Sequence, residues 1–157
     1  MAITASDIKF YKSDGTDSTG GAISATEITD NTLNNLFDDV TGDEASSGAV
    51  EYRKIFVKNT HGSLTWQDVK VWISSLTAST DDEIDISETT DITGTNATGG
   101  GQSYVRPTSK VHADVLTLGN IAAAGYAAIW IRRTVGTGAS AYDANSGQIK
   151  AEGDTAA

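Results

Sequence analysis

The stretch "EYRKIFVKNTHGSLTWQDVKVWISS", residues 51–75, decides the fold class of this chain. Two runs with apolar side chains at alternate positions, 49–59 and 64–74, flank the polar connection "NTHGS" (59–63). Alternation with a period of two is typical of β-strands, and a short connection between two such runs indicates a hairpin or a crossover between sheets. The stretch therefore predicts two strands at the centre of a β fold.

The first of these runs carries apolar side chains on both of its faces. Tyr52, Lys54 and Phe56 share one face, and Ile55 and Val57 share the other, because successive side chains of a strand point to opposite sides. One face has to pack in the core of the domain. The other face needs a second cover, which is a loop, the short helix or another subunit.

The second run contains two tryptophans, Trp66 and Trp72, which are six residues apart and share a face in a regular strand. A row of aromatic rings can stack on sugars, as in a carbohydrate-binding module. Large aromatic side chains also fill the core of a small sandwich or a subunit interface. Tyr52, Phe56, Trp66 and Trp72 are therefore the candidate residues of a partner interface.

The remainder of the chain repeats the strand pattern between glycine-rich turns, without a βαβ rhythm. Further strands are expected within 6–11, 22–28, 77–87, 111–121, 125–136 and 148–154. This organisation predicts one all-β domain spanning residues 1–157. We expect an antiparallel β-sandwich of immunoglobulin-like or jelly-roll type, with seven to eight strands and one short helix.

The strand pattern stops within 29–48, where we expect a short helix followed by a flexible acidic loop, "DDVTGDEASSG" (38–48). Leu33, Leu36 and Phe37 fall on one helical face, and Asp30 is a candidate N-cap. The many Asp and Asn residues limit the helix to one or two turns.

A long polar segment, 88–110, contains three consecutive glycines and Pro107, the only proline of the chain. Proline stops a strand, and glycine leaves the backbone free. We therefore expect a loop that is mobile or is ordered by a partner.

Composition excludes several classes of protein. The chain has no cysteine, which rules out disulfides, thiolate catalysis and Cys-ligated zinc and suits a reducing cytoplasm. A net charge of −10 argues against nucleic acid as a partner, because phosphate binding needs Lys and Arg. No run reaches the ~18 apolar residues of a membrane helix, and "MAITASDIKF" has no features of a secretory leader.

Motifs for catalysis or metal binding are missing from the sequence. No G-x-S-x-G or similar pattern places a serine against His61 or His112, the only histidines. Most acidic side chains lie in polar loops. Catalysis by paired carboxylates needs one carboxyl group with a raised pKa, and solvated loop residues lack the burial that would raise it. Loop acids such as Asp14, Asp17 and Asp43 are ligands that calcium prefers, but no EF-hand pattern organises them. We therefore expect no enzyme activity, no cofactor and no metal site.

Three segments of the chain resemble a known class of proteins. They are "ITASDIKFYKSDG" (3–15), "DNTLNNLFDDVTGDEASSGAVEYRKIFVKNTHGSLTWQDVKVWI" (30–73) and "GYAAIWIRRTV" (125–135), the last followed by "AY" and a closing strand that ends in "GDT". Together they resemble small virion structural proteins that are encoded among the head and tail genes of tailed bacteriophages. The motifs that carry this resemblance are structural and not catalytic.

The resemblance implies a non-enzymatic component of a virus particle. Capsid decoration (cement) proteins of such phages are often small β-rich domains that bind as trimers where capsomers meet. We accordingly expect a decoration protein that binds the outer head surface and stabilises the shell. Its partners would be the major capsid protein or other virion proteins and further copies of itself, with a trimer favoured, and neither nucleic acid nor membrane. It would reside in the virion after assembly in the host bacterial cytoplasm.

Two alternatives stay open at this point. The first is a tail or baseplate structural protein of the same virion class. The second, from another class, is a carbohydrate-binding β-sandwich module that uses the tryptophans as a platform.

Overall fold

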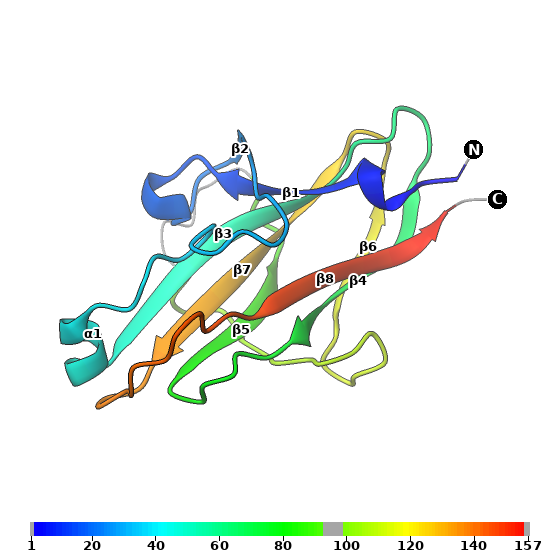
Figure 1. Cartoon of the computed structure of the whole chain (residues 1–157). Coiled ribbons are helices and arrows are strands. Elements are labelled where there is room, and N and C mark those ends of the chain that lie inside the picture. Colours follow the sequence, from blue (N-terminus) through cyan, green and yellow to red (C-terminus); the bar gives the residue numbers. More distant parts are fainter. Residues whose placement is uncertain (1, 93–98, 156–157) are drawn as a thin grey trace.

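The computed structural model describes residues 2–92 and 99–155 and shows two antiparallel β-sheets that face each other (Figure 1). The five-stranded sheet has the order β2-β1-β3-β7-β5 and consists of β1 (Ile8–Ser13), β2 (Ile23–Glu27), β3 (Ala49–Asn59), β5 (Asp82–Thr89) and β7 (Tyr126–Val135). The three-stranded sheet has the order β6-β4-β8 and consists of β4 (Trp66–Ser75), β6 (Leu116–Ile121) and β8 (Gln148–Thr155). The helices of the described residues are α1 (Gly42–Ser47) and the 3-10 helices η1 (Ala5–Asp7) and η2 (Thr16–Ser18). The prediction of an antiparallel β-sandwich with eight strands and one short α-helix is confirmed.

The core lies between the two sheets and is built from alternate residues of the central strands. β3 and β7 pair without irregularity from Ala49 opposite Val135 to Lys58 opposite Tyr126. The inward positions of this pair carry β-branched residues such as Ile55 and Ile129, which pack well on a pleated surface. β3 has the bounds that its alternating pattern predicts, 49–59.

A β-bulge at Asp68 interrupts β4. Asp68 has a φ of 48°, in the left-handed region, and the pairing of β4 with both neighbours shifts register near it. The bulge places Trp66 in the core with Val69 and Val71, whereas Trp72 points to the outer side of the three-stranded sheet. The prediction that Trp66 and Trp72 share a face is therefore wrong, because a bulge breaks the two-residue period on which it rested.

The short helix lies at a different place from the one predicted. Residues 28–40 form turns, with Asn31 and Asn34 at φ values of 56° and 54°, which no right-handed helix accommodates. The helix α1 follows at Gly42–Ser47, where Thr41 and Glu44 form a capping box. No described helix is long and apolar enough to cross a membrane.

The segment predicted as a mobile or partner-ordered loop is held by the chain itself over its described part. Residues 93–98 of that segment lie outside the described residues. Residues 99–106, which we name the strap, cross the outer face of the five-stranded sheet behind β3 and β7 (Figure 1). The strap reaches the edge of β5, where Val105 and Ile86 exchange two backbone hydrogen bonds of 2.9 Å.

Candidate functional site

The outer face of the five-stranded sheet is a buried surface, although it points away from the core. Lys54 and Phe56 of β3 and Trp130 of β7 are fully buried on this face. Phe56 also packs edge-on against the ring of Tyr126, with centroids 5.6 Å apart. The second cover that the sequence requires for this face is therefore supplied within the chain.

Aromatic contacts bind the strap to this face. The ring centroids of Tyr104 and Tyr52 are 5.7 Å apart, and the guanidinium carbon of Arg132 lies 4.7 Å from the Tyr104 centroid. Burial raises the pKa of the Tyr104 hydroxyl, which donates to the carbonyl oxygen of Gly99 at 2.9 Å. A side chain at Gly99 would place its Cβ 2.7 Å from Tyr52, so only glycine allows this close approach.

Ion pairs fasten the other end of the strap. Arg106 contacts Glu83 at 2.6 Å through Nη1 and Asp85 at 2.7 Å through Nε. The second oxygen of Asp85 accepts from Nη2 of Arg132 at 2.7 Å. Asp85 is buried whereas the two arginines are partly exposed, and hydrogen bonds between oppositely charged groups are stronger than those between neutral groups. This chain of charges ties the strap to β5 and β7.

Lys54 is a fully buried cation beneath the same cover. Its Nζ lies 3.4 Å from Oδ2 of Asp91, and 5.6 Å and 6.0 Å from the ring centroids of Phe56 and Trp130. Removing an ammonium group from water costs free energy, which a counter-ion and aromatic ring faces partly offset. The ion pair between Lys54 and Asp91 thus holds the segment that follows β5 against the sheet, because the buried ammonium group of Lys54 needs a counter-ion.

The four candidate interface residues do not form one surface. Tyr52 and Phe56 share the outer face of the five-stranded sheet, as predicted, with Phe56 fully buried and Tyr52 half-buried beside Tyr104. Trp66 lies in the core, and Trp72 lies on the outer side of the other sheet with 7% of its surface exposed. The structure therefore has no row of two tryptophans on β4, and a sugar platform loses the geometry on which that alternative was based.

A second pair of arginines forms a cluster that the sequence reasoning missed. Arg53 and Arg133, both buried, point inward, and their guanidinium carbons lie 4.9 Å and 5.0 Å from the centroid of the Phe37 ring. Glu51 joins them: one carboxylate oxygen contacts Arg53 at 3.0 Å and the other contacts Arg133. Arg53 shares its face of β3 with Ile55 and therefore points to the core. Because arginine is rarely buried without a charged partner, its inward position in the alternating pattern was the sequence signal for a buried ion pair.

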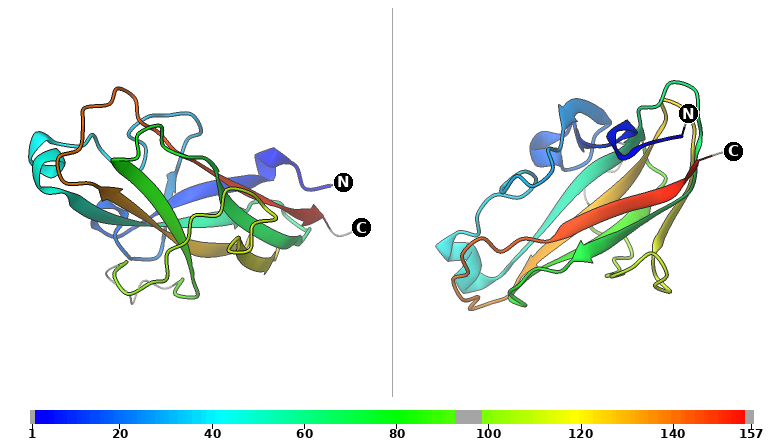
Figure 2. Two further views of the ribbon diagram at one scale, coloured as in Figure 1. Left: turned by 90° about the horizontal axis from the view of Figure 1, so that it is seen from below. Right: turned by 45° about the vertical axis from the view of Figure 1, so that its right-hand side comes forward.

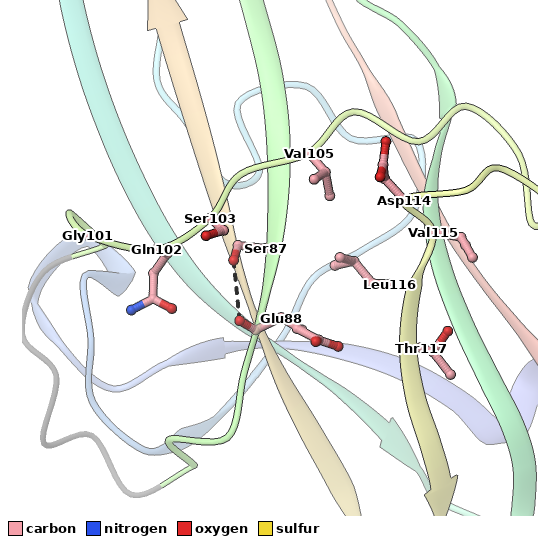
Figure 3. Close-up of a pocket in the computed structure, with 10 residues that line it drawn as sticks. All are labelled: Ser87, Glu88, Gly101, Gln102, Ser103, Val105, Asp114, Val115, Leu116 and Thr117. Atoms are coloured by element: carbon pink, nitrogen blue, oxygen red, sulfur yellow. Dashed lines mark hydrogen bonds between the residues drawn. The ribbon is translucent and has the colours of Figure 1, made fainter.

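A cavity lies at the open side of the sandwich, between the β5 edge, the strap and the start of β6 (Figure 3). It has a volume of about 600 Å³ and is lined by polar groups such as Glu88, Gln102 and Asp114, with Val105 and Leu116 among its apolar residues. No histidine is among its lining residues, which include the hydroxyl side chains of Ser87, Ser103 and Thr117. Its chemistry suits hydrogen bonding to a bound group.

The two histidines serve local turns. Nδ1 of His61 accepts the backbone N–H groups of Ser63 at 3.2 Å and Leu64 at 3.1 Å, and Nδ1 of His112 accepts that of Asp114 at 3.2 Å. Across residues 2–92 and 99–155, no three His, Asp or Glu side chains are arranged to hold a metal ion.

No protein-family model matches the chain, and no characterised protein and no solved structure is significantly similar to it.

Proposed function

We propose that this chain is a non-enzymatic structural protein of a tailed-phage virion, and specifically a capsid decoration protein that binds the outer surface of the head and stabilises the shell. One observation carries the proposal. The segments 30–73 and 125–135, which resemble phage virion proteins, meet at Phe37, Arg53 and Arg133. The resembling residues thus belong to the scaffold of the sandwich, which supports a structural role.

Exposed apolar side chains near α1 support a docking role. Val50, the second residue of β3, is half exposed near the end of α1, and Tyr142 is exposed in the segment after β7. In that segment the backbone N–H of Gly138 donates to the carbonyl oxygen of Ala45 in α1. Aromatic and aliphatic side chains at a surface are the groups that most often anchor protein interfaces. This end of the molecule is the surface that we assign to the shell.

The mechanism is thermodynamic. A protein that binds only assembled coat subunits stabilises the assembled state in proportion to the logarithm of its free concentration. The partners in this proposal are the major capsid protein or other virion proteins, and copies of the chain itself, with three-fold symmetry as the arrangement that the resemblance implies. Assembly takes place in the bacterial cytoplasm, and the finished protein resides in the virion.

Heads assembled without this chain provide the test. Purified protein should co-sediment with such heads and raise the temperature at which they break, and the shift should grow with protein concentration until the sites are filled. An unrelated acidic β-sandwich of similar size is the control and should have no effect. Heads that neither bind the chain nor gain stability would refute the proposal, and binding to isolated tails alone would favour the tail or baseplate role.

A further inference from the structure

The strand β8 is an edge strand. It forms one side of the three-stranded sheet and pairs only with β4 (Figures 1 and 2). Within residues 2–92 and 99–155, no backbone–backbone hydrogen bond reaches the side of β8 that faces away from β4. At the end of the strand, the hydroxyl of Thr155 accepts the backbone N–H of Ile3 at 3.2 Å. Such an edge is a template for pairing with another strand.

The other edges are blocked by local features. On β5, Ile86 already exchanges hydrogen bonds with Val105 of the strap. On β6, Gly119 has a φ of 71° at a register shift, and irregularity of this kind obstructs edge pairing. On the short β2, the hydroxyl of Ser24 accepts the backbone N–H of Thr26 at 3.0 Å.

A second copy of β8 would have to pair in a particular register. If two copies of β8 pair antiparallel about a two-fold axis, the residue numbers of every directly opposed pair add up to the same sum. When this sum is even, side chains that point to the core in one copy lie opposite side chains that point to the core in the other. With the axis at Ala151, Lys150 lies opposite Glu152 of the second copy, and Gln148 lies opposite Asp154. Moving the axis to Lys150 or to Glu152 would place like charges opposite each other.

Small residues occupy the centre of this register. Ala151 faces its own copy, and Gly153 lies opposite Ile149 of the second chain, so no two large inward side chains compete for the same space. Glu152 is ionised at neutral pH, since Lys110 and Lys150 hold its pKa below the ordinary value. Within the chain it contacts Lys110 and, at 3.4 Å, Lys150. The side chains of Lys150 and Glu152 remain 56% and 38% exposed.

We propose that β8 is a homodimer interface, in which two chains pair antiparallel about a two-fold axis at Ala151 and join their three-stranded sheets into one six-stranded sheet. The matched charges of Lys150 and Glu152 select this register. Lysine on a strand edge usually discourages pairing, but here each lysine meets a glutamate. The inference does not rest on the virion role, and a three-fold contact between copies would use a different surface, because a two-fold interface pairs one patch with itself.

Charge reversal tests the register. The wild-type chain should sediment with twice its mass of 16.3 kDa and dissociate on dilution. Lys150→Glu and Glu152→Lys each place two like-charged pairs across the axis and should weaken the dimer by about tenfold or more. The double variant Lys150→Glu/Glu152→Lys restores opposite charges and should recover the wild-type dissociation constant.

Matched controls separate this contact from general effects of charge. Lys9 and Glu27 form an exposed pair at 2.8 Å on the other sheet, so Lys9→Glu and Glu27→Lys make the same changes in net charge away from β8. Both should leave the dissociation constant unchanged. Thermal unfolding of each variant establishes that it is folded.

Cysteine cross-linking gives an independent measurement. The chain has no cysteine, and paired residues of antiparallel strands have Cα atoms about 4.5–5.5 Å apart, within the range of a disulfide. Ala151→Cys should therefore oxidise to a covalent dimer, whereas Ala25→Cys on the exposed edge strand β2 should stay monomeric. A chain that is monomeric at every concentration, or a dimer that responds to neither the charge reversals nor the cysteine at 151, would overturn the proposal.

Discussion

Arg106 donates from Nε to Oδ1 of Asp85 at 2.7 Å and so joins the strap to the buried edge of β5. The carboxylate of Asp85 is buried, and its other oxygen is held by Arg132. The strap is therefore an integral layer of the fold, and the face beneath it is closed to partners while this contact lasts.

Loss of Arg106 should loosen the strap. Arg106→Ala leaves the buried carboxylate of Asp85 with one cation instead of two, and we expect a loss of about 1–3 kcal/mol in the free energy of unfolding. Hydrogen exchange at residues 99–106 should accelerate more than exchange in β3. Lys9→Ala, which removes an exposed ion pair, is the control and should cost less than about 1 kcal/mol. Equal effects of the two variants would show that the strap is not held by Arg106.

Removing the anion and removing the cation of the buried Lys54–Asp91 pair should have unequal effects on stability. Asp91→Asn should cost about 3–5 kcal/mol, because it leaves the ammonium group buried without a counter-charge. Lys54→Met should cost less, since the carboxylate of Asp91 keeps 11% of its surface exposed and methionine fills the apolar space between the rings. Denaturant unfolding measures both, and the double variant should be more stable than Asp91→Asn alone. The reverse order would contradict the burial of an ion pair at this position.

The ring of Phe37 should matter beyond its volume. Phe37→Leu keeps an apolar side chain but removes two contacts between guanidinium groups and a ring face, each worth about 0.5–1 kcal/mol. We expect a loss of about 1–2 kcal/mol in the free energy of unfolding. Leu36→Met, a neighbouring apolar exchange without a cation partner, is the control. A stability of Phe37→Leu equal to that of the control would remove the arginine cluster as a stabilising element.

The start of α1 should be sensitive to acid. Hydrogen bonds from the backbone and hydroxyl of Thr41 hold the pKa of Glu44 below its ordinary value of 4.5. Because the folded pKa is the lower one, the stabilisation is complete above the unfolded pKa and is lost as the pH falls through the folded pKa. The protection factors of the Gly42–Ser47 amides, which correct for the pH dependence of intrinsic exchange, should therefore fall on acidification below the ordinary value. Glu44→Gln should abolish this pH dependence, and an unchanged dependence would assign it to another group.

Much of the sandwich follows from local pattern. β3 matches the predicted run because every inward position from Ile55 onward obeys the two-residue period, and the outer positions Tyr52, Lys54 and Phe56 follow from the same rule. The need for a second cover over these side chains was also readable in the sequence. The segment that supplies this cover could not be predicted from the sequence. Arg106 joins the strap to β5 through ion pairs with Glu83 and Asp85, and any loop could carry such a side chain.

The errors have local causes. The bulge at Asp68 has no strong sequence signal, since aspartate is only one of several residues that tolerate a positive φ, and it turned Trp72 away from Trp66. The helix was misplaced because the spacing of Leu36 and Phe37 suits a helix, although both residues pack on the core from a turn. The Thr41–Glu44 spacing of a capping box was present in the sequence and marks the true start.

The location of the chain on the virion tests the central claim most directly. Electron cryo-microscopy of the intact particle should show the sandwich on the outer surface of the head, where coat subunits meet, with the α1 end toward the shell. Density for the chain on the tail or baseplate alone, or its absence from the purified particle, would contradict the account.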